Sequence, residues 1–273
     1  MRNSLLFAAV IVLAISNRSF AEPMRILSWN IESGGSDPAI IVDQLRELGR
    51  YDAYCLQEVD GPEIGRITGG IREAFGKGYR YLASHTGRSD RLLIAYDAER
   101  FLLLEARELF HFQESSLNTW RHRSPLVLLL RDRASGEEFF LMTVHLARGD
   151  ARFRQEQANG LREWVSSVER PVIATGDFNF DYDFANQRGN KAWEHFTSRG
   201  SRWKWPRPEP LIDTNWSDRD SDGRDNYPDS MLDFAFVAGF DNRTIQSRVI
   251  VRDGDFPDSD ATSDHRPVAT IVD

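Results

Sequence analysis

Two short polar motifs stand beside apolar runs, and their side chains could bind a metal ion and a phosphate. Gly-Asp-Phe-Asn at 176–179 follows the apolar run 172–174, and Ser-Asp-His-Arg-Pro at 263–267 precedes the apolar run 268–272. Side chains at strand ends lie on the rim of a sheet, where ligand clefts of α/β folds usually form. Gly, Asp and Asn also favour turns, so either motif alone could be a simple turn. Both together, with matching acids upstream, indicate a functional site.

Further polar residues lie where predicted strands end, and with the two motifs they form one candidate site. Its members are Asn30, Glu58, His145, Asp177, Asn179, Asp233, Asp264 and His265. Carboxylates and carboxamides without thiolates suit Mg²⁺ or Mn²⁺ better than Zn²⁺. Two histidines can hold and protonate a phosphate near neutral pH. The set therefore predicts hydrolysis of a phosphate ester, with a metal ion and an activated water.

Three members of this set also have a purely structural interpretation. Asn30 could be a turn residue after its strand, and His145 could be a core histidine with satisfied hydrogen bonds. Asp233 lies between two apolar residues, where an unpaired charge would be costly, so its alternative role is a structural ion pair.

The elements that must position these residues predict one α/β domain. Asp37-Pro38 predicts a helix start and Gly49 its end, between strands at 24–29 and 54–56. A right-handed crossover between parallel strands would place Asn30 beside Glu58. Further strands are expected at 79–82, 92–96, 126–130, 139–145, 172–174 (stopping at Gly176), 232–237, 249–251 and 268–272, and further helices after Asp150 and near 191–196. About eleven strands with three or four helices favour two packed sheets with helices outside.

Composition separates a leader from the folded chain. Arg2, an apolar run and the small-x-small triplet 19–21 predict a secretory signal peptide at residues 1–21, although an N-terminal anchor helix is the alternative. We therefore expect a secreted or periplasmic protein with one domain at 22–273 and no stable membrane insertion. That part has 32 basic and 42 acidic residues, a formal charge of −10. A polyanion would need metal ions and local contacts, because bulk charge repels it. Cys55 is the single cysteine, so no disulfide framework is expected.

The motifs, taken in order, resemble those of the endonuclease/exonuclease/phosphatase superfamily, of which pancreatic-type deoxyribonuclease I is the best-known member. They are Trp29-Asn30, Gln57-Glu58, Val144-His145-Leu146, Gly176-Asp177-Phe178-Asn179, Leu232-Asp233-Phe234 and Ser263-Asp264-His265-Arg266-Pro267. The resemblance runs from Met24 to the C-terminus. It implies an α/β fold, a four-layer sandwich of two mixed β-sheets flanked by helices. Pancreatic-type enzymes carry disulfides that this chain lacks, so it is a distant relative of them at most. Abasic-site endonucleases usually carry tyrosine in the region where His145 stands, which argues against base-excision repair.

The resemblance also implies a role for each residue at the metal end of the site. Glu58 would be the principal ligand of Mg²⁺ or Mn²⁺, with Asn30 and Asp264 close to the ion. Asp177 would orient or deprotonate the attacking water. Asn179 would fix that water or a phosphate oxygen.

At the phosphate end, the resemblance implies that His265 contacts the phosphate and is held by Asp233. His145 would be the second imidazole, on the leaving-group side. Its acidic partner in the deoxyribonuclease pattern corresponds to Asp90, with Arg91 beside it as a substrate contact. An ordinary loop aspartate is the alternative for Asp90.

Two other stretches could determine the substrate. The segment 201–208 interleaves Arg202, Trp203, Lys204, Trp205 and Arg207, which could hold a nucleic-acid strand by stacking and phosphate contacts. Its alternative is a loop whose tryptophans anchor it to the core.

The second stretch contains Asp218, Asp220 and Asp222, the first half of a calcium loop. Its twelfth position would be Asp229, where glutamate is usual, so a solvated acidic loop is the alternative to a structural Ca²⁺ site.

These observations favour a metal-dependent phosphoesterase, with nucleic acid or another phosphate ester as its partner. A nuclease on DNA or RNA is the first interpretation. A phosphatase or phospholipid phosphodiesterase could use the same site, because one fold hosts many activities. A non-catalytic binding module is disfavoured, since every member of the catalytic set is present. We expect a monomer.

Overall fold

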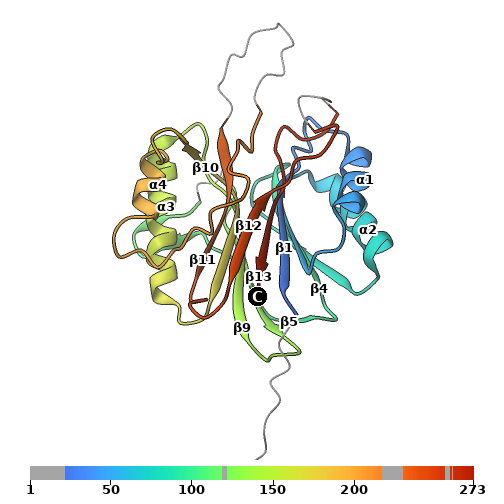
Figure 1. Ribbon diagram of the computed structural model, residues 1–273, viewed down its shortest axis with the longest axis horizontal. Helices are drawn as coiled ribbons and strands as arrows, with labels where there is room; N and C mark the ends of the chain where they lie inside the picture. Colours follow the sequence, from blue (N-terminus) through green and yellow to red (C-terminus); the bar gives the residue numbers. More distant parts are fainter. Residues whose placement is uncertain (1–21, 119–121, 217–229, 256–258, 260) are drawn as a thin grey trace, which may run out of the picture.

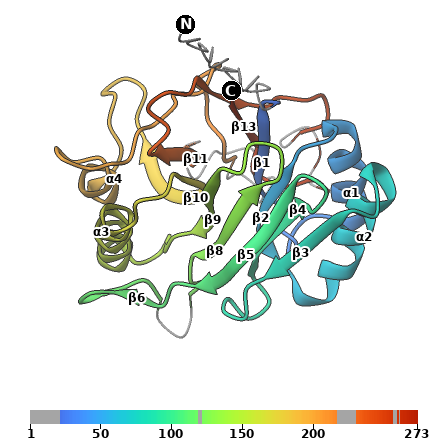
Figure 2. The same ribbon diagram turned by 90° about the horizontal axis from the view of Figure 1, so that it is seen from below.

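Two mixed β-sheets pack face to face, and helices cover their outer faces (Figures 1 and 2). The computed structural model describes residues 22–118, 122–216, 230–255, 259 and 261–273. The predicted four-layer sandwich is confirmed. The leader at 1–21 and the calcium candidates Asp218, Asp220 and Asp222 lie outside the described residues.

The six-stranded sheet has the order β12-β13-β1-β2-β4-β3. Its strands are β1 (Met24–Asn30), β2 (Ala53–Val59), β3 (Tyr79–Ala83), β4 (Arg91–Asp97), β12 (Ile245–Val249) and β13 (Val268–Val272). β1 and β2 are parallel, and Asn30 lies opposite Gln57. The expected neighbourhood of Asn30 and Glu58 therefore follows from the strand–helix–strand unit.

The five-stranded sheet has the order β11-β10-β9-β8-β5. Its strands are β5 (Phe101–Glu108), β8 (Leu126–Asp132), β9 (Glu138–His145), β10 (Val172–Tyr182) and β11 (Met231–Ala238). β9 and β10 are its parallel pair, with Asp177 opposite His145. A small hairpin, β6 (His111–Phe112) and β7 (Ser115–Ser116), follows β5.

Four α-helices of the described chain form the outer layers (Figure 1). On one side lie α1 (Pro38–Leu48) and α2 (Ile64–Phe75), with a 3₁₀ turn η1 at Gly61–Glu63, and on the other lie α3 (Ala151–Ser167) and α4 (Lys191–Phe196). The side chain of Asp37 accepts a hydrogen bond from Ala39 N, and Asp150 accepts one from Phe153 N. Both predicted N-caps are confirmed. Within the described residues, none of the helices is long and apolar enough to span a membrane.

Three strand predictions were wrong. β5 was missed because it is an edge strand in which only Phe101 is buried, so its sequence lacks the expected alternation. β12 ends at Val249, where a strand was expected to begin, and Val251 is exposed. β10 continues beyond Gly176 through a register shift, because Phe178 and Phe180 bury their rings in the core under α3 and α4.

A strap at residues 203–210 joins the two sheets along one side of the sandwich. Lys204 exchanges backbone hydrogen bonds with Val237 in the edge strand β11, at 2.8 and 2.9 Å. Glu209 N donates to Ser247 O in the edge strand β12 at 3.1 Å. The strap therefore covers parts of two edge strands that would otherwise present free backbone groups.

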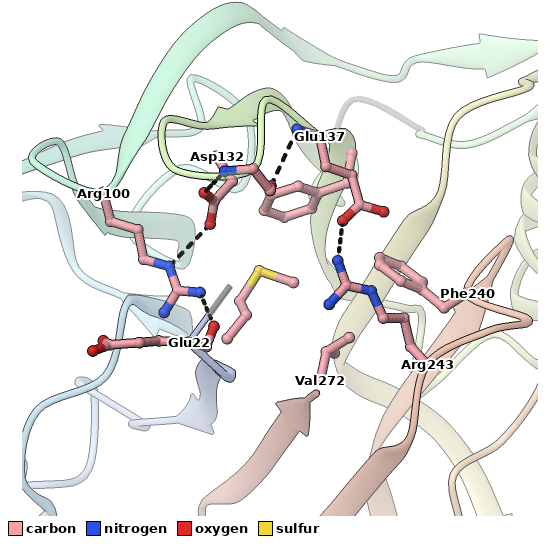
Figure 3. Close-up of a pocket in the computed structure, with 10 residues that line it drawn as sticks. Glu22, Arg100, Asp132, Glu137, Phe240, Arg243 and Val272 are labelled. Atoms are coloured by element: carbon pink, nitrogen blue, oxygen red, sulfur yellow. Dashed lines mark hydrogen bonds and ion pairs between the residues drawn. The ribbon is translucent and has the colours of Figure 1, made fainter. Parts of the chain in front are cut away.

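Ion pairs close the end of the sandwich where β1 starts and β13 finishes (Figure 3). Arg100 Nε contacts Asp132 Oδ2 at 3.2 Å, and Arg243 Nη2 contacts Glu137 Oε2 at 2.6 Å. They surround a cavity of about 20 Å³, room for about one water molecule. Asn30 and His145 end their strands at the opposite edge, so the candidate site lies away from this end.

Candidate active site

Glu58, the last residue but one of β2, has a left-handed backbone conformation with φ of 55°. Such a conformation costs free energy for a non-glycine residue, and the surrounding structure must hold it. Ser33 does so, because its backbone N donates to Glu58 O at 3.1 Å and its hydroxyl donates to the same oxygen. Asn30 Nδ2 donates to Glu58 Oε1 at 3.0 Å. The carboxylate is therefore fixed from the backbone outward.

Asn30 reaches the site through its amide nitrogen. Nδ2 also lies 3.3 Å from Asp177 Oδ2, while Oδ1 accepts a hydrogen bond from Glu32 N at 3.1 Å. This orientation follows from the hydrogen-bond network. It makes Asn30 a donor that orients two carboxylates, whereas the sequence suggested a position close to the ion.

Asp177 is buried at the centre of the site, and the preceding glycine makes this position accessible. A Cβ on Gly176 would lie 2.1 Å from Val144 O, and its φ of 143° is a further obstacle to other residues. Asn179 N donates to Asp177 Oδ1 at 2.9 Å, and Asn179 Nδ2 donates to Leu146 O at 3.0 Å. The Gly-Asp-Phe-Asn motif therefore locks β10 onto β9 beside His145.

Glu58, His145 and Asp177 come together from both sheets, each offering one ligand atom within 4.8 Å of the others. His145 Nε2 lies 3.3 Å from Asp177 Oδ2, and His145 Nδ1 lies 3.6 Å from Glu58 Oε1. Beneath them, Gln57 Nε2 donates to Thr143 Oγ1 at 2.8 Å, which ties β2 to β9. The metal group predicted from sequence was Asn30, Glu58 and Asp264. Glu58 belongs to this cluster, Asn30 contacts its carboxylate, and Asp264 Oδ1 lies 3.7 Å from His265 Nε2.

His265 forms a buried pair with Asp233. Its Nδ1 lies 2.7 Å from Asp233 Oδ2, and its Nε2 points toward Asp177 Oδ2 at 3.9 Å and Asp264 Oδ1 at 3.7 Å. The indole of Trp29 donates to His265 O at 2.8 Å and fixes its backbone. The predicted support of His265 by Asp233 agrees with this geometry.

Burial changes the protonation of these groups in different directions. Burial alone would disfavour the charged form of His265, but the charge and hydrogen bond of Asp233 outweigh it and raise the pKa of His265 to about 10. Burial, then Arg123, holds the pKa of His145 well below its usual value. Burial, then the charge of Asp233, raises the pKa of Asp177. The site thus pairs a cationic His265 with a neutral His145.

Arg123 is a member of the site that the sequence interpretation missed. Its Nη2 lies 2.5 Å from His145 Nδ1 and 2.9 Å from His145 Nε2, so the guanidinium lies against the imidazole ring and not at one nitrogen. The same atom lies 2.9 Å from Asp90 Oδ2 and 4.0 Å from Glu58 Oε1. A cation in this position disfavours a second positive charge on the imidazole, which agrees with a neutral His145. The expected partnership of His145 with Asp90 is thus mediated by Arg123. Burial raises the pKa of Asp90 to about 6, against the lowering effect of Arg123.

Several oxygen atoms near the cluster are ready to accept a ligand. Asn179 Oδ1 and Asp264 Oδ1 are buried atoms without a hydrogen-bond partner among the described residues. Unpaired buried acceptors are costly, and a cation or an ordered water would satisfy them. With the carboxylates of Glu58 and Asp177, these oxygens fit a hard divalent cation such as Mg²⁺ or Mn²⁺.

The predicted nucleic-acid grip is corrected, because its indoles face inward. Trp203 is 6% exposed and stacks on Phe196 with ring centroids 5.2 Å apart. Trp205 packs edge-on against Tyr182 and Trp193 at 4.8 and 4.9 Å. The structure therefore supports the alternative, in which the tryptophans anchor the strap to the core.

The cations of this segment also have partners within the protein. Arg202 Nη1 donates to Val165 O at 2.7 Å near the end of α3. Lys204 pairs with Asp241, and Arg207 Nη1 donates to Gln187 Oε1 at 3.0 Å. Arg91 also has a partner, because its Nε donates to Arg88 O at 3.0 Å, and it lies opposite Val59, next to Glu58, at the edge of the site.

The family of this chain follows from its similarity to known proteins. The sequence matches the Endonuclease/Exonuclease/phosphatase family over residues 27–265. The chain belongs to this family. Its members are phosphoester hydrolases, and the chain is a phosphoesterase of that family. No curated protein sequence matches it significantly.

Solved structures share the family fold. The mannosyl-6-phosphatase of Bacteroides thetaiotaomicron is 18% identical, with a TM-score of 0.65, covering 92% of this chain and 99% of that chain. The human nocturnin catalytic domain with bound sulfate is 17% identical, with a TM-score of 0.66 and coverages of 92% and 94%. D. rerio TDP2 with a single-strand DNA product is 18% identical, with a TM-score of 0.68 and coverages of 93% and 100%. These likenesses establish the fold.

Proposed function

We propose that this protein is a divalent-metal-dependent phosphodiesterase, exported by the leader at 1–21, with nucleic acid as the first substrate class to test. The observation that carries the proposal is the convergence of Glu58, Asp177 and two imidazoles at adjoining strand ends of both sheets. Carboxylates next to histidines of opposite protonation suit the hydrolysis of a phosphate ester.

Each protein group has a role that follows from its surroundings. Asp177 orients the attacking water and accepts its proton, since its raised pKa makes it a better base near neutral pH. His265, kept cationic by Asp233, binds a phosphate oxygen and stabilises the charge that develops on it. Mg²⁺ or Mn²⁺ held by Glu58 and Asp264, with Asn30 beside it, would supply further charge stabilisation at the phosphate.

The other side of the phosphate belongs to His145 and Arg123. Arg123 contacts both ring nitrogens of His145 and pairs with Asp90. A bound phosphate would compete for the same guanidinium donors, because Arg binds phosphate strongly. Binding would then free His145 to contact the leaving-group oxygen.

A phosphomonoesterase is the second candidate, and Arg123 favours it. A monoester dianion carries one more charge than a diester, and Arg123 adds a half-buried cation to the cationic His265. The inward-facing Trp203 and Trp205 also remove the sequence support for gripping a nucleic-acid strand.

One substrate panel tests both candidates. The purified protein is incubated with plasmid DNA, RNA, bis-p-nitrophenyl phosphate, p-nitrophenyl phosphate and sphingomyelin, with magnesium or with EDTA. The proposal expects magnesium-dependent cleavage of the diesters. Cleavage of p-nitrophenyl phosphate without cleavage of any diester would establish the second candidate. Hydrolysis of none of them, by protein with a cooperative thermal transition, would refute both.

A further inference from the structure

Two buried polar side chains of α3 hold the loop that follows His145. Arg154 Nη1 donates to Ala147 O and to Arg148 O, both at 2.7 Å. Gln157 Oε1 accepts a hydrogen bond from Ala147 N at 2.9 Å. Arg154 and Gln157 are 8% and 0% exposed and lie three positions apart, hence on one face of the helix.

The same helix face holds Leu117, and the residue after Leu117 contacts a neighbour of Arg123. Gln157 Nε2 donates to Leu117 O at 3.1 Å, and a Cβ on Gly160 would lie 2.8 Å from Leu117 Cδ2. Asn118 Nδ2 donates to Ser124 Oγ at 2.9 Å. Leu117 therefore rests directly on the helix, and the β6–β7 hairpin lies beside α3 (Figure 2). His122, the neighbour of Arg123, places its ring 4.9 Å from the ring of Phe153.

A long ion pair does not by itself explain why Arg154 is buried. Its Nη2 lies 3.9 Å from Asp181 Oδ2, beyond hydrogen-bond distance. Burying a guanidinium is expensive, and an apolar side chain would often stabilise the fold as well or better. The hydrogen bonds of Arg154 fix two backbone carbonyl groups, those of Ala147 and Arg148, within three residues of His145.

We propose that Arg154 and Gln157 are positioning residues, which set the contact between His145 and Arg123 by holding both of their loops on α3. This rests on the proposed function in so far as His145 and Arg123 act on the phosphate. Gln157 joins the two segments directly, because its two amide atoms bind Ala147 and Leu117. Displacing a catalytic group by about 1 Å can cost about a hundredfold in rate.

A double-mutant cycle tests this proposal. Arg154→Met, Gln157→Leu and His145→Asn are made singly, and each helix variant is combined with His145→Asn. With bis-p-nitrophenyl phosphate, we expect each helix substitution to lower kcat at least tenfold with little change in KM. In the His145→Asn background the same substitutions should change kcat less than twofold, because the contact between His145 and Arg123 that they set is already lost.

Two variants serve as controls. Arg154→Lys keeps a cation that can reach one carbonyl, so it should recover part of the lost kcat. Arg152→Met removes an exposed arginine from the same turn of α3 and should leave kcat unchanged. Equal losses of kcat with and without His145 would overturn the proposal, because the helix residues would then act independently of the imidazole.

A spectroscopic measurement separates this proposal from the proposed function. In ¹⁵N-histidine-labelled protein, Arg154→Met should shift the ring signals of His145 and leave those of His265 in place. Unchanged His145 signals would overturn the positioning role, whatever the enzyme hydrolyses. An inactive wild-type protein whose His145 signals do shift would refute the proposed function and leave the positioning role standing.

Discussion

Trp203→Ala distinguishes a structural strap from a nucleic-acid grip. Trp203 is 6% exposed, stacks on Phe196 and belongs to the core under α3 and α4. A side chain of this size buries about 150–250 Å², worth about 4–6 kcal/mol at about 25 cal/mol per Å². Large-to-small substitutions of aromatic core residues cost about 3–5 kcal/mol.

One feature of the wild type reduces this loss. Among the described residues, Trp203 Nε1 is buried without a hydrogen-bond partner. Such a donor costs about 1–3 kcal/mol, and the substitution relieves that cost. Taking the relief as about 1 kcal/mol, we expect Trp203→Ala to lower the free energy of unfolding by about 2–4 kcal/mol. For a chain of this size the Tm should fall by about 5–15 °C.

The assay combines thermal unfolding with kinetics on folded protein. Trp203→Ala should leave kcat and KM unchanged for both an oligonucleotide and bis-p-nitrophenyl phosphate at a temperature below its transition. Trp203→Phe, the matched control, keeps an aromatic ring against Phe196 and removes the unpaired donor, so its Tm should stay near that of the wild type. A Trp203→Ala protein with wild-type Tm but a raised KM for the oligonucleotide alone would refute this reasoning.

Three further predictions follow from the site. His145→Asn and His265→Asn should each lower kcat roughly a hundredfold or more, and the double variant should lose far less than the product, as expected for groups acting on one phosphate; multiplicative losses would show that they act separately. Arg123→Met should lower kcat/KM for p-nitrophenyl phosphate by about ten- to a hundredfold, the scale of one hydrogen bond to a charged group, and less for the bis ester; equal effects on both esters would exclude a role in recognising the extra charge. The third concerns stability in EDTA: because the pKa of His265 rises from 6.5 to about 10 on folding, its pairing with Asp233 contributes fully below about pH 6.5 and is lost as pH rises through about 10. The difference in Tm between wild type and His265→Asn should shrink over that range, and a difference that grows with pH would contradict the pairing.

Local sequence signals predicted the elements that carry most of the site. Asp37, Pro38 and Gly49 marked the ends of α1, and the hairpin of β8 and β9 followed from its two apolar runs. Polar residues at strand ends then identified Glu58, His145 and Asp177. These predictions succeeded because capping, alternation and strand ends depend on residues near in sequence.

Arg123 was missed because it precedes its strand, whereas most of the predicted site residues lie at the carboxyl ends of theirs. β8 runs antiparallel to β9, with Leu126 opposite Thr143, so residues just before Leu126 lie beside His145. Both strands were predicted, at 126–130 and 139–145. An antiparallel pairing between them places a polar residue just before the first strand next to a site residue at the end of the second.

Other features depend on packing between distant segments. The alternation of tryptophans and cations does not determine whether the indoles face solvent or pack against Phe196, Tyr182 and Trp193. The sequence contains only a weak indication of the positioning role of α3. The apolar face of this helix at Leu161, Trp164 and Val165 continues toward the N-terminus to Gln157 and Arg154. Polar residues on a buried helix face need buried partners.

The most direct test of the central claim is hydrolysis of bis-p-nitrophenyl phosphate by wild type and Glu58→Gln during one magnesium titration. Glu58 lies where Asn30, His145 and Asp177 meet, and the substitution removes a charge at nearly constant shape. We predict that EDTA abolishes wild-type activity, that magnesium or manganese restores it, and that Glu58→Gln stays nearly inactive with an unchanged fold. Full wild-type activity in EDTA, or a Glu58→Gln enzyme with the wild-type response to magnesium, would contradict the claim.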